Sequence, residues 1–581
     1  MFRIKKINPF SFYSFVAILL YFTISFVSVE GWKEKKIMSA DRANYYVYLP
    51  ATFIYNDLHF SYADSLNEAL GSRKVTYFVN EEGKRCQKMT AGVSIMELPF
   101  FLLAHVWASL DPKYEANGYS EIYYFFITLS ALVYALLALY FLRKILLRFS
   151  SDKTTAFVLL LIAGGTNLYY YSTYIGGISH NPGLFLLACF FWFSIKYIDS
   201  KSIKALSIAL FCIGMATIVR TTNILFGIFL LTYIAESSWS YKGVIQHINK
   251  NVKHYLFAFL AFFIPVIVQM SLWKYTTGDW IYYSYRDEGF FFNDPEILNG
   301  LFSGRNSLIP YAPFLILAFL GILIPTKKHF PKYSLILPLG IFIYVIYSWW
   351  CWWYGGSVGS RAAIESYIIL AILLGYFIDY LWKKLPFNIV LGMLTLLATF
   401  SIYFGHLKAA QYKNVILHWD SMTYDNYWDI FLTSKRSADY NEKLQIPDYK
   451  NAKTIGEEYQ GFKEMTTEEP LSEGINIELK EIEWNNRDSI RIKAFIFGGN
   501  KVKKKVVKLK ISSDEGQFSK EYSIIPDKRS RQWNDAIVTI YIPENIREKS
   551  IKVAYIYSGA SRCYYKLPEL IITNTLPDLK N

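Results

Sequence analysis

The chain has 581 residues, of which 53% are hydrophobic and 18% are Phe, Tyr or Trp, and its net charge is +14. This composition excludes a disordered chain, a collagen-like chain and a small disulfide-stabilised domain. The apolar residues come in uninterrupted runs of about twenty, which are too long for strands and too poor in polar residues for amphipathic helices. The sequence therefore predicts a polytopic, all-α membrane bundle.

The first apolar run, residues 10–29, carries no charge and follows Arg3, Lys5 and Lys6. Its length fits a retained membrane anchor better than a cleaved signal peptide. We expect about eleven transmembrane helices in all. The further runs lie at roughly 122–142, 154–172, 182–195, 203–219, 222–236, 255–273, 308–325, 333–350, 363–382 and 385–404.

Lysines and arginines cluster in every second connection between these runs, for example at 143–153 and 383–384. Basic residues in short loops mark the cytoplasmic side. The pattern predicts a multi-pass protein of a bacterial inner membrane with a cytoplasmic N-terminus and large outer loops at about 30–121 and 274–307. The basic charge thus sets topology, and no nucleic-acid partner is expected.

After about residue 445 the pattern changes to the period of two that is typical of strands. Val507, Leu509 and Ile511 alternate with lysines, and turn signals follow at 513–516. We expect a transmembrane domain over 1–405, a connector over 406–470, and a periplasmic β-sandwich of roughly seven short strands over 471–581.

Motifs for nucleotide or tightly bound metal chemistry do not occur in the sequence. It contains no GxxxxGK[ST], no GxGxxG on a strand-to-helix turn and no Asp-x-Asp pair. No nucleotide cofactor is expected, and a requirement for a divalent metal stays open. The five cysteines show no CxxC or zinc spacing and are interpreted as mostly inert.

The residues that suggest chemistry fall on the predicted outer side. Asp41 follows the first span closely, where a carboxylate in a partly dry cleft suits a general base. The alternative is a solvated loop carboxylate. Cations near span ends are expected to bind a donor phosphate, although surface charges or snorkelling anchors are the alternative. These cations are Lys88, Lys274, Arg361, Arg220 and Arg286.

Arg361 follows three glycines that allow close approach of a ligand, with a pair to Glu365 as the alternative. Five aromatic residues occur within the six positions 349–354, more than membrane anchoring requires. Contacts to sugar or lipid are predicted for a set of aromatic residues. The set is Tyr45, Tyr46, His180, Trp352, Trp353 and Tyr354, where His180 alternatively stabilises the turn before Asn181-Pro182.

Several of these segments resemble the outer-face motifs of GT-C membrane glycosyltransferases, the superfamily that includes the protein O-mannosyltransferases (family 39) and the aminoarabinose transferases of lipid A. The matching segments are DRANYYVY from Asp41, KMTAGVSIMELPFF (88–101), GTNLYYYSTYIGGISHNP (165–182), RTTN (220–223) and YGGSVGSR (354–361).

The resemblance implies inverting transfer from a polyprenyl phosphate- or pyrophosphate-linked sugar. Asp41 would be the base or would orient the acceptor, and Lys88, Lys274 and Arg361 would bind the donor phosphate. The mannosyltransferases carry an adjacent acidic pair in the first loop, whereas Arg42 follows Asp41 here. This departure leaves the subfamily and any metal requirement open.

The sequence thus predicts a glycosyltransferase that moves a lipid-linked sugar or glycan to an extracytoplasmic protein, glycan or lipid. Its expected partners are the polyprenyl-linked donor, membrane lipid and the acceptor. A transporter or flippase of lipid-linked substrate is one alternative, although nearly charge-free spans and the gathering of polar groups on one face argue against it. A non-catalytic subunit that docks an envelope complex through the β-domain is the other.

Overall fold

The structure, a computed structural model, describes residues 8–34, 38–72, 74–80, 82–238, 241–285, 288–325, 331–419, 422–437 and 440, together with eight C-terminal strands and Leu479. The chain forms two compact units. One comprises residues 1–284, 292–348 and 352–443, and the other comprises 285–291, 349–351 and 444–581.

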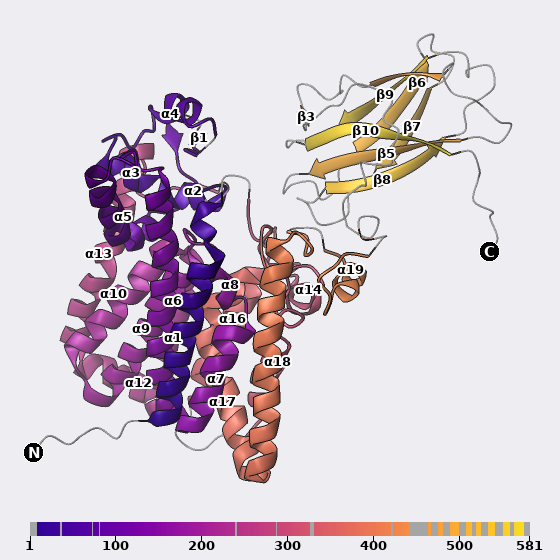
Figure 1. Cartoon of the computed structure of the whole chain (residues 1–581). Helices are drawn as coiled ribbons and strands as arrows, with labels where there is room; N and C mark the ends of the chain where they lie inside the picture. The colour runs from indigo at the N-terminus through magenta and orange to yellow at the C-terminus, as the bar shows by residue number, and fades with distance from the viewer. Residues whose placement is uncertain are drawn as a thin grey trace, which may run out of the picture. The chain divides into compact units, whose positions relative to one another are not determined.

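The first unit is mostly helical (Figure 1). Its elements are α1 (Pro9–Val29), η1 (Gly31–Lys33), α2 (Asp41–Tyr46), α3 (Tyr48–Phe53), α4 (Ala63–Ala69), β1 (Phe78–Val79), β2 (Arg85–Cys86), α5 (Gly92–Leu110), α6 (Glu121–Phe149), α7 (Asp152–Gly165), α8 (Leu168–Thr173), α9 (His180–Ser200), α10 (Ile203–Val219), η2 (Thr221–Gly227), α11 (Ile228–Ser238), α12 (Tyr241–Lys250), α13 (Val252–Thr277), α14 (Ile297–Phe302), η3 (Pro313–Leu315), α15 (Ile316–Gly321), α16 (Lys332–Tyr347), η4 (Arg361–Ser366), α17 (Tyr367–Lys384), α18 (Phe387–Lys413) and α19 (Tyr424–Asp429).

Among the described residues, seven helical segments are long and apolar enough to cross a membrane, as expected of an integral membrane protein. They are Pro9–Lys33, Gly92–Leu110, Glu121–Phe149, His180–Ser200, Val252–Thr277, Arg361–Lys384 and Phe387–Lys413. Shorter apolar helices cover Ile203–Val219, Thr221–Glu236 and Lys332–Tyr347.

Two of the predicted runs are not continuous helices. The run 154–172 is divided between α7 and α8, because the backbone becomes extended at Thr166 after two glycines. The run 308–325 begins with the irregular segment around Pro310 and becomes helical only at η3. Glycine and proline therefore interrupt segments whose composition alone suggests a full span.

Helix α5 was not expected, since the sequence placed its residues in an outer loop. It packs along the first half of α6: the Tyr134 hydroxyl donates to the Met96 carbonyl at 2.6 Å, and His105 Nδ1 lies 2.6 Å from the Tyr123 hydroxyl. Glu97 and Pro99 interrupt its apolar pattern, which made the helix hard to recognise.

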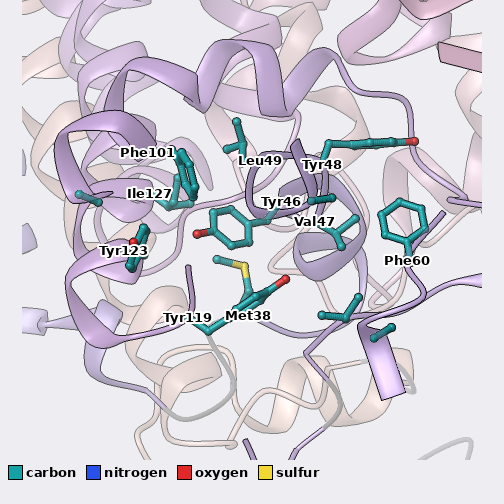
Figure 2. Close-up of a cluster of buried hydrophobic side chains, with 14 of the residues drawn as sticks. Met38, Tyr46, Val47, Tyr48, Leu49, Phe60, Phe101, Tyr119, Tyr123 and Ile127 are labelled. Atoms are coloured by element: carbon teal, nitrogen blue, oxygen red, sulfur yellow. The ribbon is translucent and has the colours of Figure 1, made fainter. Parts of the chain in front are cut away.

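A hydrophobic cluster fixes α2 against α5 and the start of α6 (Figure 2). Tyr46 is fully buried in it, and its hydroxyl donates to the Gly118 carbonyl at 2.5 Å. Phe101 and Tyr119 contact the Tyr46 ring edge-on, with ring centroids 6.0 Å and 5.8 Å away. This packing sets the position of Asp41, the first residue of α2.

The described strands of the second unit form two four-stranded antiparallel sheets, of order β3-β10-β5-β8 and β4-β9-β6-β7. In the second sheet Leu509 pairs with Tyr555 and Ile511 with Val553, and all four are buried, on one face of the sheet. The strands are β3 (Lys463–Met465), β4 (Ile475–Glu478), β5 (Ser489–Gly498), β6 (Val507–Ser513), β7 (Ser519–Ile524), β8 (Trp533–Ile540), β9 (Ser550–Tyr557) and β10 (Cys563–Thr573).

Candidate functional site

An ion pair joins Asp41 and Arg361, which lie 320 positions apart in the sequence. Arg361 Nη2 donates to Asp41 Oδ2 at 2.9 Å and to the Gly355 carbonyl at 3.3 Å. The Arg361 side chain is 17% exposed and that of Asp41 is 36% exposed, so the pair is reachable from solvent. The carboxylate and the cation that the sequence singled out therefore meet at one place.

The charge state of Asp41 depends on this pairing. Burial raises the pKa of the Asp41 carboxyl, but the Arg361 guanidinium, together with Lys88 and His180, more than offsets that effect and leaves the pKa below its usual range. Asp41 is thus an ionised acceptor at neutral pH. The influence of Lys88 also places that half-buried side chain in the electrostatic surroundings of Asp41.

The backbone before Arg361 is held by close contacts. Gly359 has a φ of +61°, and a Cβ there would lie 2.8 Å from the Tyr311 side chain. The next residue, Ser360, donates its N–H to the Ser307 carbonyl at 3.1 Å, and its hydroxyl lies 2.8 Å from that of Tyr347. The Gly359 position thus serves close packing within the protein, and it aims Arg361 at α2.

A second charged group lies one turn further along η4. Glu365 is fully buried, and its carboxylate oxygens lie 3.1 Å and 3.3 Å from His180 Nδ1. Arg220 Nη1 lies 3.7 Å from the same carboxylate and 3.5 Å from His180 Nδ1. Glu365 therefore pairs with His180 and Arg220, whereas the ion-pair partner of Arg361 is Asp41.

Sequence reasoning missed the role of Glu365, although a signal was present. A carboxylate within an apolar run is costly unless it is paired, so it marks a buried polar site. His180 is the first residue of α9, and no side-chain cap bond forms at that helix start. Its ring faces Glu365, which links α9 and the end of α10 to η4.

Two of the predicted aromatic residues flank these charges. Tyr45 is buried one turn after Asp41; burial and then the Asp41 charge raise the pKa of its phenol. The Arg220 guanidinium lies 5.2 Å from the centre of the Tyr354 ring, within cation–π range. The hydroxyl of Tyr354 donates to the Ile346 carbonyl at 2.9 Å.

Other predicted site residues lie elsewhere in the first unit. Tyr46 points into the core (Figure 2), and Trp352 and Trp353 are buried, the latter with the Arg305 guanidinium 3.6 Å from its ring centre. Lys274 donates to the Gly278 carbonyl at the C-terminal end of α13, where a cation is favourable. Arg286 lies outside the described residues.

No family model matches the chain, and no curated protein matches it. Among solved structures it is similar to ArnT from Cupriavidus metallidurans in the apo state, with a TM-score of 0.44 and 14% identity over 68% of this chain and 64% of that one. ArnT from the same organism bound to undecaprenyl phosphate gives a TM-score of 0.42 and 12% identity over 69% of this chain and 70% of that one.

The apo oligosaccharyltransferase of Archaeoglobus fulgidus gives a TM-score of 0.39 and 12% identity over 75% of this chain and 61% of that one. This chain thus spans slightly less than two thirds of the length of apo ArnT and of the oligosaccharyltransferase.

Proposed function

We propose that this protein is an integral-membrane glycosyltransferase that transfers a sugar or glycan from a polyprenyl-phosphate-linked donor to an extracytoplasmic acceptor. The observation that carries the proposal is the solvent-accessible Asp41–Arg361 pair, with Lys88 and Arg220 nearby. A carboxylate beside several cations supplies a base for the acceptor and a binding site for a phosphate. No specific contact among the described residues favours the transporter or the scaffold.

In the proposed reaction the acceptor hydroxyl attacks the anomeric carbon as its proton passes to Asp41. The bond from that carbon to the phosphate oxygen breaks, and polyprenyl phosphate leaves with the electron pair. Arg361 stabilises the charge that grows on the leaving phosphate. In the absence of donor, the Asp41 carboxylate forms its ion pair with the same guanidinium.

Donor binding therefore changes the base as well as the electrophile. When the donor phosphate binds the Arg361 guanidinium, Asp41 loses its strongest opposite charge. The pKa of Asp41 then rises toward the range where a carboxylate is an effective base. Glu365 holds Arg220 and His180 in place, and the His180 charge in turn acts on Asp41.

The Asp41→Asn variant tests the proposal. The full-length protein is reconstituted in vesicles with a panel of polyprenyl-linked sugars, and donor consumption is measured. Loss of a general base is expected to slow transfer by about 100-fold or more. Asp64→Asn is the matched control, because Asp64 forms a comparable 3.0 Å pair with Arg85 in the same loop region. Undiminished transfer by Asp41→Asn would remove Asp41 from the mechanism.

A further inference from the structure

An apolar cavity lies at the end of the first unit opposite Asp41 and Arg361. It has a volume of about 260 Å³ and is bordered by the ends of α1, α7, α17 and α18. Arg361 precedes α17, whereas Trp382 belongs to the last turn of that helix, so a whole helix separates the two places. The residues that line the cavity include Phe10, Lys153, Phe157, Trp382, Phe387 and Leu391.

Lys153 is the cation in this lining, and its ammonium lies 4.3 Å from the centre of the Phe387 ring and 5.5 Å from that of Phe10. Within the described ranges Lys153 forms no ion pair. The nearest carboxylate in sequence, Asp152, instead accepts the backbone N–H groups of Phe10 and Ser11 at 3.0 Å each. It thereby caps the N-terminal end of α1.

Trp382 supplies a second polar group, one that has no hydrogen-bond acceptor in the described part of the chain. Its ring stacks on Phe387 with a centroid distance of 5.2 Å, while its indole nitrogen is buried and finds no acceptor among the described residues. A buried N–H without an acceptor is costly, and tryptophan usually finds one. An acceptor from outside the protein would remove this cost.

We propose that this cavity binds an anionic phospholipid, with part of an acyl chain against the aromatic wall and the headgroup at Lys153. A phosphate or ester oxygen accepts the Trp382 N–H. An apolar cavity with one cation and one unused donor is complementary to an amphiphile with an anionic acceptor head. The exposed Lys383 and Lys384 next to Trp382 add attraction for a net negative headgroup and disfavour a zwitterionic one that presents its own cation.

Lipid competition on the full-length protein tests this site. The protein is equilibrated with an equimolar mixture of phosphatidylglycerol and phosphatidylcholine, and the lipids that remain bound are counted by native mass spectrometry. The wild type is expected to retain phosphatidylglycerol preferentially. Lys153→Met is expected to lower that preference roughly fivefold, the effect of one cation near a lipid headgroup.

Lys144→Met is the matched control. Lys144 flanks an apolar run at its end, as Lys153 flanks one at its start, and lies over aromatic rings, 4.9 Å from Tyr140 and 5.2 Å from Phe141, but it does not line the cavity. Trp382→Phe keeps the stacked ring and removes the N–H, so it should lower retention of both lipids. Equal retention of the two lipids by the wild type overturns the proposal, as does an equal loss in the Lys144→Met and Lys153→Met variants.

Discussion

Two carboxylates in the site differ in what surrounds them. Asp41 keeps more than a third of its side chain exposed and pairs with one guanidinium, whereas Glu365 is fully buried between His180 and Arg220. A pair that water reaches contributes little to stability, because water screens the two charges. Removing one member of a buried pair leaves a desolvated charge without compensation. The first pair is therefore suited to binding, and the second to holding the site together.

Glu365→Ala is expected to lower the free energy of unfolding by about 3–5 kcal/mol, because Arg220 loses its buried counter-charge. Asp64→Ala, which breaks the exposed pair with Arg85, should cost no more than about 1 kcal/mol. Thermal unfolding of both variants in the same detergent measures the difference. Equal melting temperatures for the two would contradict a structural role for Glu365.

The stability that Asp41 contributes should depend on pH. Its pKa is lowered in the folded protein, so the contribution is present above the ordinary aspartate pKa of about 3.9 and is lost as the pH falls through the folded value. At neutral pH, Asp41→Asn should cost at most about 1 kcal/mol. Melting curves from pH 7 to pH 3 should bring variant and wild type together at low pH. A difference in melting temperature between variant and wild type that grows as the pH falls would contradict this expected pH dependence.

Part of the site could be predicted from the sequence, because the sequence indicates on which side of the membrane each polar residue is expected to lie. Asp41 and Arg361 both follow from asking which polar residues lie beyond the outer ends of apolar runs, and they meet in the structure. Glu365 does not follow from this reasoning, because it lies inside an apolar run, where its spacing suggests only a pair with Arg361. Trp352 and Trp353 are both buried, which the sequence does not indicate, since an aromatic run near a site gives no sign of which rings pack inward.

At the scale of elements, the segment before η4 depends on its glycines for different reasons. Gly356 and Gly359 both have positive φ values, of +71° and +61°. A Cβ at 356 would meet nothing within 4 Å, whereas one at 359 would lie 2.8 Å from Tyr311. Both positions resist substitution through backbone strain, and Gly359 adds a steric clash.

Alanine substitutions at Gly356 and Gly359 separate the effect of backbone strain from that of the steric clash. Gly356→Ala should cost about 1–2 kcal/mol, the penalty for a left-handed L-residue. Gly359→Ala should cost more, and because it displaces the chain next to Arg361, it should also weaken donor binding. Melting temperatures and the affinity for a polyprenyl phosphate give the two readouts. If both variants bind donor as the wild type does, Gly359 does not position Arg361.

The ends of elements were harder to predict than their existence. The last apolar run was expected to end at residue 404, yet α18 continues to Lys413. Lys408 is buried there, with its ammonium 3.0 Å from both the Gln411 side-chain oxygen and the Phe431 carbonyl. A lysine normally ends an apolar run, but here two oxygen atoms accept hydrogen bonds from its ammonium, and the contact with Phe431 is invisible in the sequence.

At the scale of the whole molecule, the Asp41–Arg361 pair constrains the topology. Two groups in one ion pair lie on the same side of the membrane, so the chain between them crosses an even number of times. The predicted spans between residues 122 and 350 supply an even set. Helix α5 has the length and composition of a span, but counting it would make the number odd. We infer that α5 packs against α6 without crossing the membrane, with both of its ends on the same side as Asp41.

Cysteine labelling tests this arrangement. In a chain whose native cysteines are changed to serine, Ser65→Cys precedes α5, Lys113→Cys follows it, and Asn388→Cys lies at the opposite end of the bundle; all three positions are exposed. A membrane-impermeant maleimide added to intact spheroplasts should label positions 65 and 113 equally, and position 388 only after permeabilisation. If 113 behaves like 388, then α5 crosses the membrane. An even count would then require another of the predicted spans to remain on one side.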